Sequence, residues 1–116
     1  MMEKIFLLTS SEIEILKNEF EVLNFTTDFD IVYEEQVPCA GIALIEGEIE
    51  IFKDSKVKKK IDHGYLIGIY HFLNEYPVKY GCRIKAKSKI ILLGKSAMLN
   101  LRQNIKMKDH PIFKTM

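Results

Sequence analysis

Apolar and polar residues recur with two different periods along this chain, and the change of period marks where helix gives way to strand. Near the N-terminus, four apolar residues follow the spacing of one helix face: Ile13, Leu16, Phe20 and Leu23. The segment Thr9–Glu12 before them fits a capping box, in which the Thr9 hydroxyl and the Glu12 carboxylate each accept a hydrogen bond from a backbone amide. The sequence therefore predicts a first helix that begins near Thr9.

From Phe25 onward, apolar residues alternate with polar ones, which is the period of a strand with one face exposed to water. Turn-forming residues interrupt the alternation at Glu46-Gly47, at Lys53–Lys56 and at the Gly64–Gly68 corner. The pattern predicts about seven or eight short strands, among them residues 29–33, 41–45, 48–52, 56–61, 82–87 and 90–93. The lysine-rich segment 56–61 has the composition of a sheet edge, because lysine discourages edge-to-edge pairing.

Further helical segments complete the pattern. Ile69–Asn74 has the length of a short helical turn. A second long helix is expected after Gly94, with Ser96 as its N-cap and with three apolar residues on one face: Met98, Leu101 and Ile105. We predict no element for the proline-containing end of the chain. The expected organisation is one mainly β domain with flanking helices over residues 5–106, followed by a C-terminal tail over residues 107–116.

The composition fits a single globular domain. A chain of 116 residues with 47% hydrophobic and 28% charged residues is long enough to form one core. No apolar run approaches the ~18–20 residues that cross a bilayer, and the first residues turn polar too early for a secretory signal. Cys39 and Cys82 lack the spacing of metal ligands, so we expect free thiols and a cytoplasmic protein.

The net charge of +1 conceals two halves of opposite sign. Residues 1–50 hold 2 basic and 12 acidic residues, so that 2 − 12 = −10, whereas residues 51–116 hold 15 basic and 4 acidic residues, so that 15 − 4 = +11. Two interpretations follow. Either the halves interleave in the fold and neutralise each other, or they present charged surfaces to a partner or to a second copy.

The order of these features resembles the cyclic-nucleotide-binding domain family, whose β-roll is the sensory half of bacterial Crp-type regulators. The likeness rests on the early helix, the strand–glycine–strand unit Ile42–Phe52, the glycines at 64 and 68, and Ile84-Lys85-Ala86 before the last strand and helix. It covers roughly residues 5–105. The resemblance implies a double-stranded β-helix, that is, a jelly-roll-like β-roll. An unrelated barrel or jelly roll is the alternative.

The family binds its ligand in a phosphate cassette after the glycine corner, where an arginine contacts the cyclic phosphate and a glutamate contacts the ribose. The resemblance gives six candidate ligand-binding residues here: Gly68, Ile69, Tyr80, Gly81, Cys82 and Arg83. Gly68 matches the cassette glycine, but Ile69 stands at the glutamate position and Tyr80 at the arginine position. Isoleucine accepts no hydrogen bond and tyrosine brings no positive charge. We therefore do not expect cyclic AMP or cyclic GMP to bind in the usual mode.

Arg83 has two interpretations that the sequence leaves open. If the segment Tyr70–Lys79 changes register, Arg83 or Lys79 could reach the ligand pocket. If residues 82–87 form a regular strand, Arg83 points away from Cys82 and lies in solvent. In the second case Cys82 is a small buried hydrophobic residue rather than a nucleophile.

The sequence offers no catalytic or metal site. His63, His71 and His110 lack metal-ligand spacing, no phosphate-binding glycine loop occurs, and three glutamates of 46–50 share the exposed face of a strand. We predict no catalytic residues, no metal, no cofactor and no enzymatic activity. The lysine-rich strand lacks interleaved aromatic residues, and the segment after the last helix is too short for a helix-turn-helix, so nucleic-acid binding is not expected.

These observations lead to one functional hypothesis and one alternative. The hypothesis is a stand-alone, degenerate cyclic-nucleotide-binding-like domain in bacterial signalling. It would act as a protein-interaction or adaptor module that binds a partner protein or forms a homodimer, with the helix at Ser96–Lys106 as the coupling element. The alternative is a small-molecule or nucleotide sensor with an altered cassette, lined by Ile69, Tyr80 and Arg83. No membrane association is expected.

Overall fold

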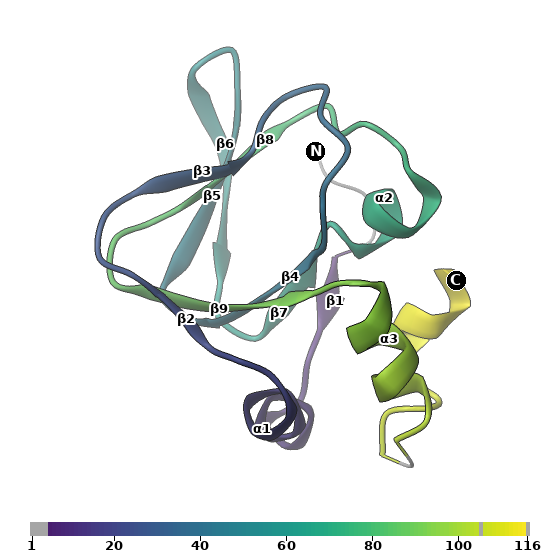
Figure 1. The fold of residues 1–116 in the computed structure, drawn as a ribbon. Helices are drawn as coiled ribbons and strands as arrows, with labels where there is room; N and C mark the ends of the chain where they lie inside the picture. The colour runs from purple at the N-terminus through teal and green to yellow at the C-terminus, as the bar shows by residue number, and fades with distance from the viewer. Residues whose placement is uncertain (1–4, 105, 116) are drawn as a thin grey trace.

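A computed structural model describes residues 5–104 and 106–115. They form two antiparallel sheets that fold over one another as a roll (Figure 1). The first sheet has the order β1-β7-β4-β9-β2, with the bounds Phe6–Leu7 (β1), Tyr65–Ile67 (β7), Gly41–Glu46 (β4), Ser88–Leu93 (β9) and Leu23–Phe25 (β2). The second has the order β3-β8-β5-β6, with the bounds Phe29–Val32 (β3), Gly81–Ile84 (β8), Glu48–Lys53 (β5) and Lys56–Asp62 (β6).

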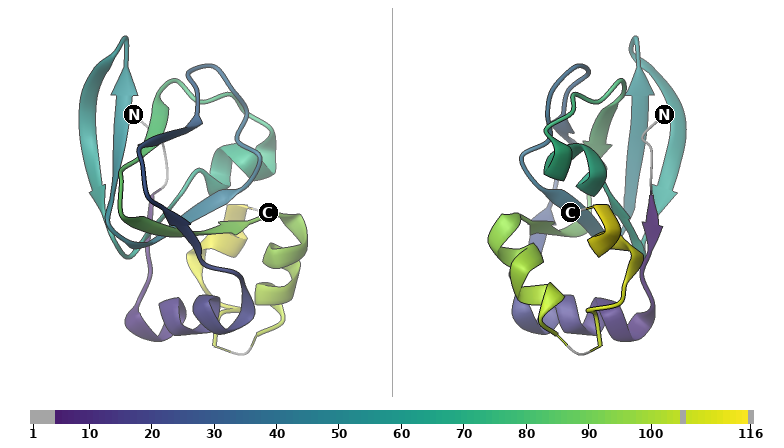
Figure 2. Two further views of the ribbon diagram at one scale, coloured as in Figure 1. Left: turned by 60° about the vertical axis from the view of Figure 1, so that its left-hand side comes forward. Right: turned by 90° about the vertical axis from the view of Figure 1, so that its right-hand side faces the viewer.

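Helices flank the roll at one end. The two longer ones are Ser10–Glu19 (α1) and Lys95–Arg102 (α3), and they lie with the 3₁₀ helix Pro111–Thr115 (η1) beyond the first sheet (Figure 2). The short helix Ile69–Asn74 (α2) lies between β7 and β8 in the sequence and contacts both β4 and η1. The predicted mainly β fold with flanking helices is therefore confirmed.

Two apolar cores hold these layers together, and the strand period explains both. In β4, Ile42 and Leu44 face the core between the sheets, whereas Ala43 faces the core beneath the helices. In β9, Ile90 and Ile91 divide in the same way. A strand that is buried on both faces reads as a continuous apolar run, which is why these two segments lack the polar alternation of β5 and β8.

The start of α1 agrees with the prediction, but its end does not. The Thr9 hydroxyl accepts a hydrogen bond from the Glu12 amide (3.2 Å), and the Glu12 carboxylate accepts one from the Thr9 amide (2.8 Å), which completes the capping box. The helix stops at Glu19. Placing Leu23 on this helix was wrong, because Leu23 pairs with Ile90 as part of β2. Pairing with a distant strand outweighs the local helical spacing.

The predicted N-cap of the last long helix was also wrong. The N-cap is Gly94, in an extended conformation and without a side-chain cap, and α3 covers Lys95–Arg102 instead of Ser96–Lys106. Ile105, predicted for the apolar face, lies outside the described residues. Beyond it, Met107 and Ile112 are fully buried in the helical core, and η1 forms where we predicted no element. The boundary between domain and tail at residue 106 remains a prediction.

The hairpin of β5 and β6 stands out from the body of the roll (Figure 1). Its tip residues Asp54 and Ser55 both have positive φ, at 52° and 64°, which is the conformation of a type I′ turn. The amide of Asp54 donates to the Glu34 carboxylate (3.2 Å), so the loop after β3 holds the tip. β6 is the edge strand of its sheet, as its lysine content predicted.

Candidate functional site

The segment that corresponds to the family's cassette runs from Gly68, through α2, to Arg83 in β8. Gly68 is the N-cap of α2 with φ of 76°, a left-handed conformation that glycine adopts without strain. Its carbonyl accepts a hydrogen bond from the Phe72 amide (2.9 Å). The predicted short helix at Ile69–Asn74 is confirmed. With six residues, α2 is a corner element of the roll.

Ile69, at the position of the family's glutamate, does not face the space between the sheets. Its side chain is fully buried in the core beneath the helices, together with Phe72 and Ala43. It lies so close to Gly41 of β4 that a β-carbon on Gly41 would overlap the Ile69 Cδ1 atom. The absence of a side chain at Gly41 therefore leaves the space that the Ile69 side chain fills, and this contact holds α2 against the first sheet.

Gly81 gives space to an aromatic ring on the outer face of the second sheet. A β-carbon at Gly81 would overlap the Phe52 ring and lie 2.7 Å from its Cε2 atom. The guanidinium carbon of Arg83 lies 4.9 Å from the centroid of the same ring. Phe52 is thereby held between the Gly81 backbone and the Arg83 side chain, and only 8% of it is exposed.

Cys82 and Tyr80 contribute to the core between the sheets. Cys82 is fully buried there, as the strand period predicted, and burial raises the pKa of its thiol to about 12. Tyr80 lies at the margin of the core, with the Lys53 ammonium 5.4 Å from its ring centroid. Lys53 also donates a hydrogen bond to the Lys79 carbonyl (3.3 Å). Val78, which the sequence did not single out, is fully buried in the same core.

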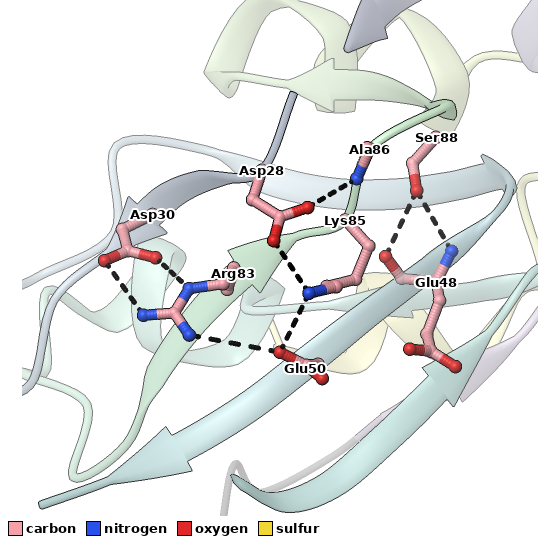
Figure 3. A network of polar contacts seen from close by, with 8 residues as sticks. All are labelled: Asp28, Asp30, Glu48, Glu50, Arg83, Lys85, Ala86 and Ser88. Atoms are coloured by element: carbon pink, nitrogen blue, oxygen red, sulfur yellow. Dashed lines mark hydrogen bonds and ion pairs between the residues drawn. The ribbon is translucent and has the colours of Figure 1, made fainter. Parts of the chain in front are cut away.

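Arg83 lies on the opposite face of β8 and is engaged by an acidic residue of β3 (Figure 3). Its Nε donates to the Asp30 carboxylate at 2.6 Å and its Nη2 at 3.4 Å. The hydrogen bond to Asp30 raises the pKa of Arg83 further above its ordinary value. Of the two interpretations for Arg83, a strand residue that points away from Cys82 is the one found, with an ion pair to Asp30 in place of free solvation. The predicted strand over residues 82–87 was too long, because β8 ends at Ile84 and Lys87 has a positive φ of 67° in the turn before β9.

Lys85, the first residue after β8, continues this ionic network (Figure 3). Its Nζ lies 2.7 Å from the Asp28 carboxylate and 3.5 Å from that of Glu50, which itself lies 4.0 Å from Arg83. The hydrogen bond from Lys85, followed by one from the Ala86 amide, lowers the pKa of Asp28. Glu50 is on the outer face, as alternation predicted, but its flanking cations leave only 8% of it exposed.

The interior of the roll is filled with aliphatic side chains from both sheets. The core between the sheets consists of these buried residues: Val32, Ile42, Leu44, Ile49, Ile51, Ile61, Ile67, Val78, Cys82, Ile84 and Ile90. None of them carries a charge or a hydroxyl. A bound nucleotide would need polar partners in this space.

Three surface cavities on the described part of the molecule lie away from the candidate cassette residues, none of which lines them. The largest of these three, about 420 Å³, lies at the turn before β9 beside Phe25 and Lys87. One of about 340 Å³ follows β6 at Lys59 and Lys60, and one of about 70 Å³ lies beside Cys39. Over residues 5–104 and 106–115, no group of three or more His, Cys, Asp or Glu side chains is arranged to hold a metal.

The comparisons with known proteins rest on structure. No family model and no curated protein matches this sequence. A protein of a cyclic-GMP-dependent signalling pathway that regulates bacterial phytopathogenesis superposes with a TM-score of 0.74 at 15% identity, over 93% of this chain and 86% of that one. A cyclic nucleotide-binding domain from Methylobacillus flagellatus gives 0.65 at 16% identity, over 90% and 62%. The chain has the cyclic-nucleotide-binding fold.

The catabolite activator protein of Thermus thermophilus has the same fold over part of its length. Its TM-score is 0.68 at 13% identity, over 93% of this chain and 51% of that protein, so this chain spans about half of it. The predicted Crp-type β-roll is confirmed as a fold. Identities this low carry no information about the ligand. In the described residues, no helix is long and apolar enough to cross a membrane.

Sequence reasoning missed the partners of the cassette residues rather than the residues themselves. Asp30 and Phe52 were assigned only to strands, yet they fix the positions of Arg83 and Gly81. One signal was present: Asp28 and Asp30 alternate with the same period as Arg83 and Lys85. Only the pairing of β3 with β8 turns that match into contacts.

Proposed function

We propose that this chain is a regulatory module in which the cyclic-nucleotide-binding fold serves as a protein-binding scaffold and not as a sensor of cyclic AMP or cyclic GMP. The observation that carries the proposal is the aliphatic filling of the roll, to which the cassette segment itself contributes Val78 and Cys82. A nucleotide in that space would have to displace buried apolar side chains and leave its own polar atoms without partners.

Arg83, the charged side chain considered for the cassette, is already engaged in other contacts. Turning Arg83 toward the roll interior would break its two hydrogen bonds to Asp30 and its contact with Phe52. Leaving Asp30 without its partner adds a further cost, because a partly buried carboxylate loses its counter-ion. The residue at the family's glutamate position, Ile69, is committed to the helical core. Each of these features supports a roll that has lost the usual ligand.

A protein-binding role leaves the exterior of the roll as the working surface. Several large apolar side chains are exposed there, among them Leu99 on α3 at 54% and Tyr33 after β3 at 59%. Such residues at the rim of a rigid β scaffold suit contact with a partner protein or with a second copy of the chain. The opposite charges of the two halves of the sequence would orient that contact.

A thermal-shift experiment tests the absence of cyclic-nucleotide binding. The wild-type chain is heated with cyclic AMP, cyclic GMP, cyclic di-GMP or guanosine at millimolar concentration. A ligand present at 100 times its dissociation constant adds ~2.7 kcal/mol to the unfolding free energy, which is a shift of several degrees. We expect no shift. A shift of that size with a cyclic mononucleotide would overturn the proposal, and one with guanosine alone would favour a small-molecule sensor.

A variant at Tyr80 tests whether the filled interior or the missing arginine prevents cyclic-nucleotide binding. Tyr80→Arg restores the family's arginine at the margin of the core, and it should gain no affinity because the interior stays filled. If Tyr80→Arg alone binds cyclic AMP, a single missing charge and not the filled interior explains the loss, and the argument from packing fails. Circular dichroism of the variant confirms that it is folded.

A further inference from the structure

The strand β6 carries the largest concentration of uncompensated positive charge on the sheets. Its first five residues are exposed, and four of them are lysines: Lys56, Lys58, Lys59 and Lys60. None of these forms an ion pair with another described residue. By contrast, Lys85 after β8 and Lys89 on β9 each lie within 4 Å of a carboxylate. Lys60 stands opposite Glu50 in the register, but that carboxylate contacts Arg83 and Lys85.

The backbone of β6 also has an unused side. In the strand order of the second sheet β6 is last, and within the described residues it pairs only with β5. An edge strand presents amide and carbonyl groups that can pair with a further strand. Both views show no helix beside the outer edge of β6, so none obstructs an incoming strand there (Figure 2).

A cavity of about 340 Å³ follows the base of this edge. It is lined by Lys59, Lys60 and Asp62 of β6, with Tyr65 and Ile5 opposite. A cavity of this size admits one or two side chains of a bound segment. The groups that line it would hold an acidic side chain against the two ammonium groups and an apolar side chain against Ile5 and Tyr65.

We propose that β6 binds an acidic, extended segment of a partner protein by strand addition. This inference rests on the proposed protein-binding function and names the chemistry of the partner. Because Lys58, Lys59 and Lys60 are consecutive, both faces of the strand carry lysine, and the fitting segment has a run of three or more consecutive Asp or Glu residues. The same lysines repel another basic edge, which excludes pairing of two copies through β6.

Nucleic acid is the less suitable partner. The basic stretch covers five residues, ~16 Å of strand, and acidic residues bound it at both ends, Asp54 and Asp62. That length fits a short peptide strand better than the longer track of a phosphate backbone. β6 also contains no arginine for paired contacts to phosphate and no aromatic ring for stacking.

Fluorescence anisotropy with a defined peptide tests the proposal. The probe is a fluorescein-labelled decapeptide with four consecutive glutamates between valine and threonine residues, in low salt. We expect saturable binding that falls about tenfold or more in Lys58→Glu/Lys59→Glu/Lys60→Glu, because three attractive contacts become repulsive. The matched control Lys95→Glu/Lys106→Glu/Lys108→Glu changes net charge equally at exposed sites away from β6 and should retain wild-type affinity within about threefold. The milder Lys58→Gln/Lys59→Gln/Lys60→Gln gives the same test if charge reversal impairs folding.

Two further probes separate strand addition from charge alone. A peptide of the same charge with proline at alternate positions lacks the amide donors of a strand and should lose most of its affinity. Equal affinity for that peptide, no binding of the glutamate peptide, or an equal loss in the control variant would overturn the proposal. Tighter binding of a DNA oligonucleotide of the same charge would overturn it in favour of nucleic acid. None of these outcomes bears on the cyclic-nucleotide experiment, so the two proposals fail separately.

Discussion

Replacing Gly47 with alanine should destabilise the roll strongly, because two independent features of the turn between β4 and β5 exclude a side chain. The φ angle of Gly47 is 99°, a region that L-residues rarely adopt. A β-carbon there would also overlap the Ser88 hydroxyl and lie 2.7 Å from the Ser88 Cα atom. Since Ser88 is buried and belongs to β9, the clash is with a fixed part of the neighbouring sheet.

The close approach of Gly47 to Ser88 brings the Ser88 hydroxyl within hydrogen-bond distance of the Glu48 backbone. The Ser88 hydroxyl accepts a hydrogen bond from the Glu48 amide (3.0 Å) and donates one to the Glu48 carbonyl (3.2 Å). Alanine at position 47 would displace this hydroxyl and break both of its hydrogen bonds to Glu48, although the Glu48 carbonyl would still accept one from the Lys85 amide (3.0 Å). The left-handed backbone costs ~1–2 kcal/mol and the overpacking ~1–3 kcal/mol, so Gly47→Ala should lose about 3 kcal/mol of unfolding free energy.

Urea unfolding followed by circular dichroism measures this loss, and for a chain of 116 residues it corresponds to a fall in Tm of roughly 12 °C. Gly94→Ala is the matched control, because a β-carbon at Gly94 meets nothing within 4 Å. It should stay within about 1 kcal/mol of the wild type. Gly47→Ala/Ser88→Gly should not recover full stability, since the Ser88 backbone remains in the way. Equal stability of Gly47→Ala and Gly94→Ala would refute the steric argument.

Three further predictions concern pH, thiol reactivity and capping. The pKa of Asp28 is lowered in the folded state, chiefly by Lys85, so its contribution is present above its ordinary pKa and is lost as pH falls through the folded value. Asp28→Asn should therefore show a shallower loss of stability on acidification in pH-dependent urea unfolding, and an unchanged slope would contradict this. With a disulfide reagent at pH 8, the exposed Cys39 should react at once and the buried Cys82 only after unfolding, whereas two equivalents released together would exclude the burial of Cys82. Gly94→Ser should increase the unfolding free energy by ~0.5–1 kcal/mol and raise Tm by a few degrees, because the N-cap of α3 lacks a side-chain acceptor. Calorimetry that finds no rise in Tm would contradict this explanation.

The cassette positions could be predicted from the sequence, but their environment could not. Gly68 and the helix after it follow from neighbouring residues and were found in place. The strand period placed Cys82 inside and Arg83 outside, which is also what the structure has. The resemblance to the family suggested that Ile69 lines the ligand pocket, whereas its side chain lies in the helical core. The spacing of apolar residues does not distinguish a side chain in the ligand pocket from one in the helical core, because both environments are apolar.

Structural features that depend only on neighbouring residues could also be predicted from the sequence. The capping box of Thr9 and Glu12 and the hairpin tip at Asp54 and Ser55 involve residues within three positions of each other, so the sequence specifies them directly. Leu23 shows the limit of such predictions. It continues the helical spacing but joins β2, because hydrogen bonds to β9 satisfy its backbone.

The sequence by itself thus determined the longer helices and strands, their glycine turns and the apolar face of the alternating strands, because these depend on residues that are close along the chain. It did not predict the short strands β1 and β7 or the helix η1. The tertiary structure alone decided what fills the roll and which acid meets Arg83. Asp30 and Arg83 are 53 positions apart, and the aliphatic interior combines strands from both sheets. Contacts over such separations depend on how the two sheets pack against each other. That packing fills the interior of the roll with aliphatic side chains and leaves the lysine-rich strand β6 at the edge of its sheet.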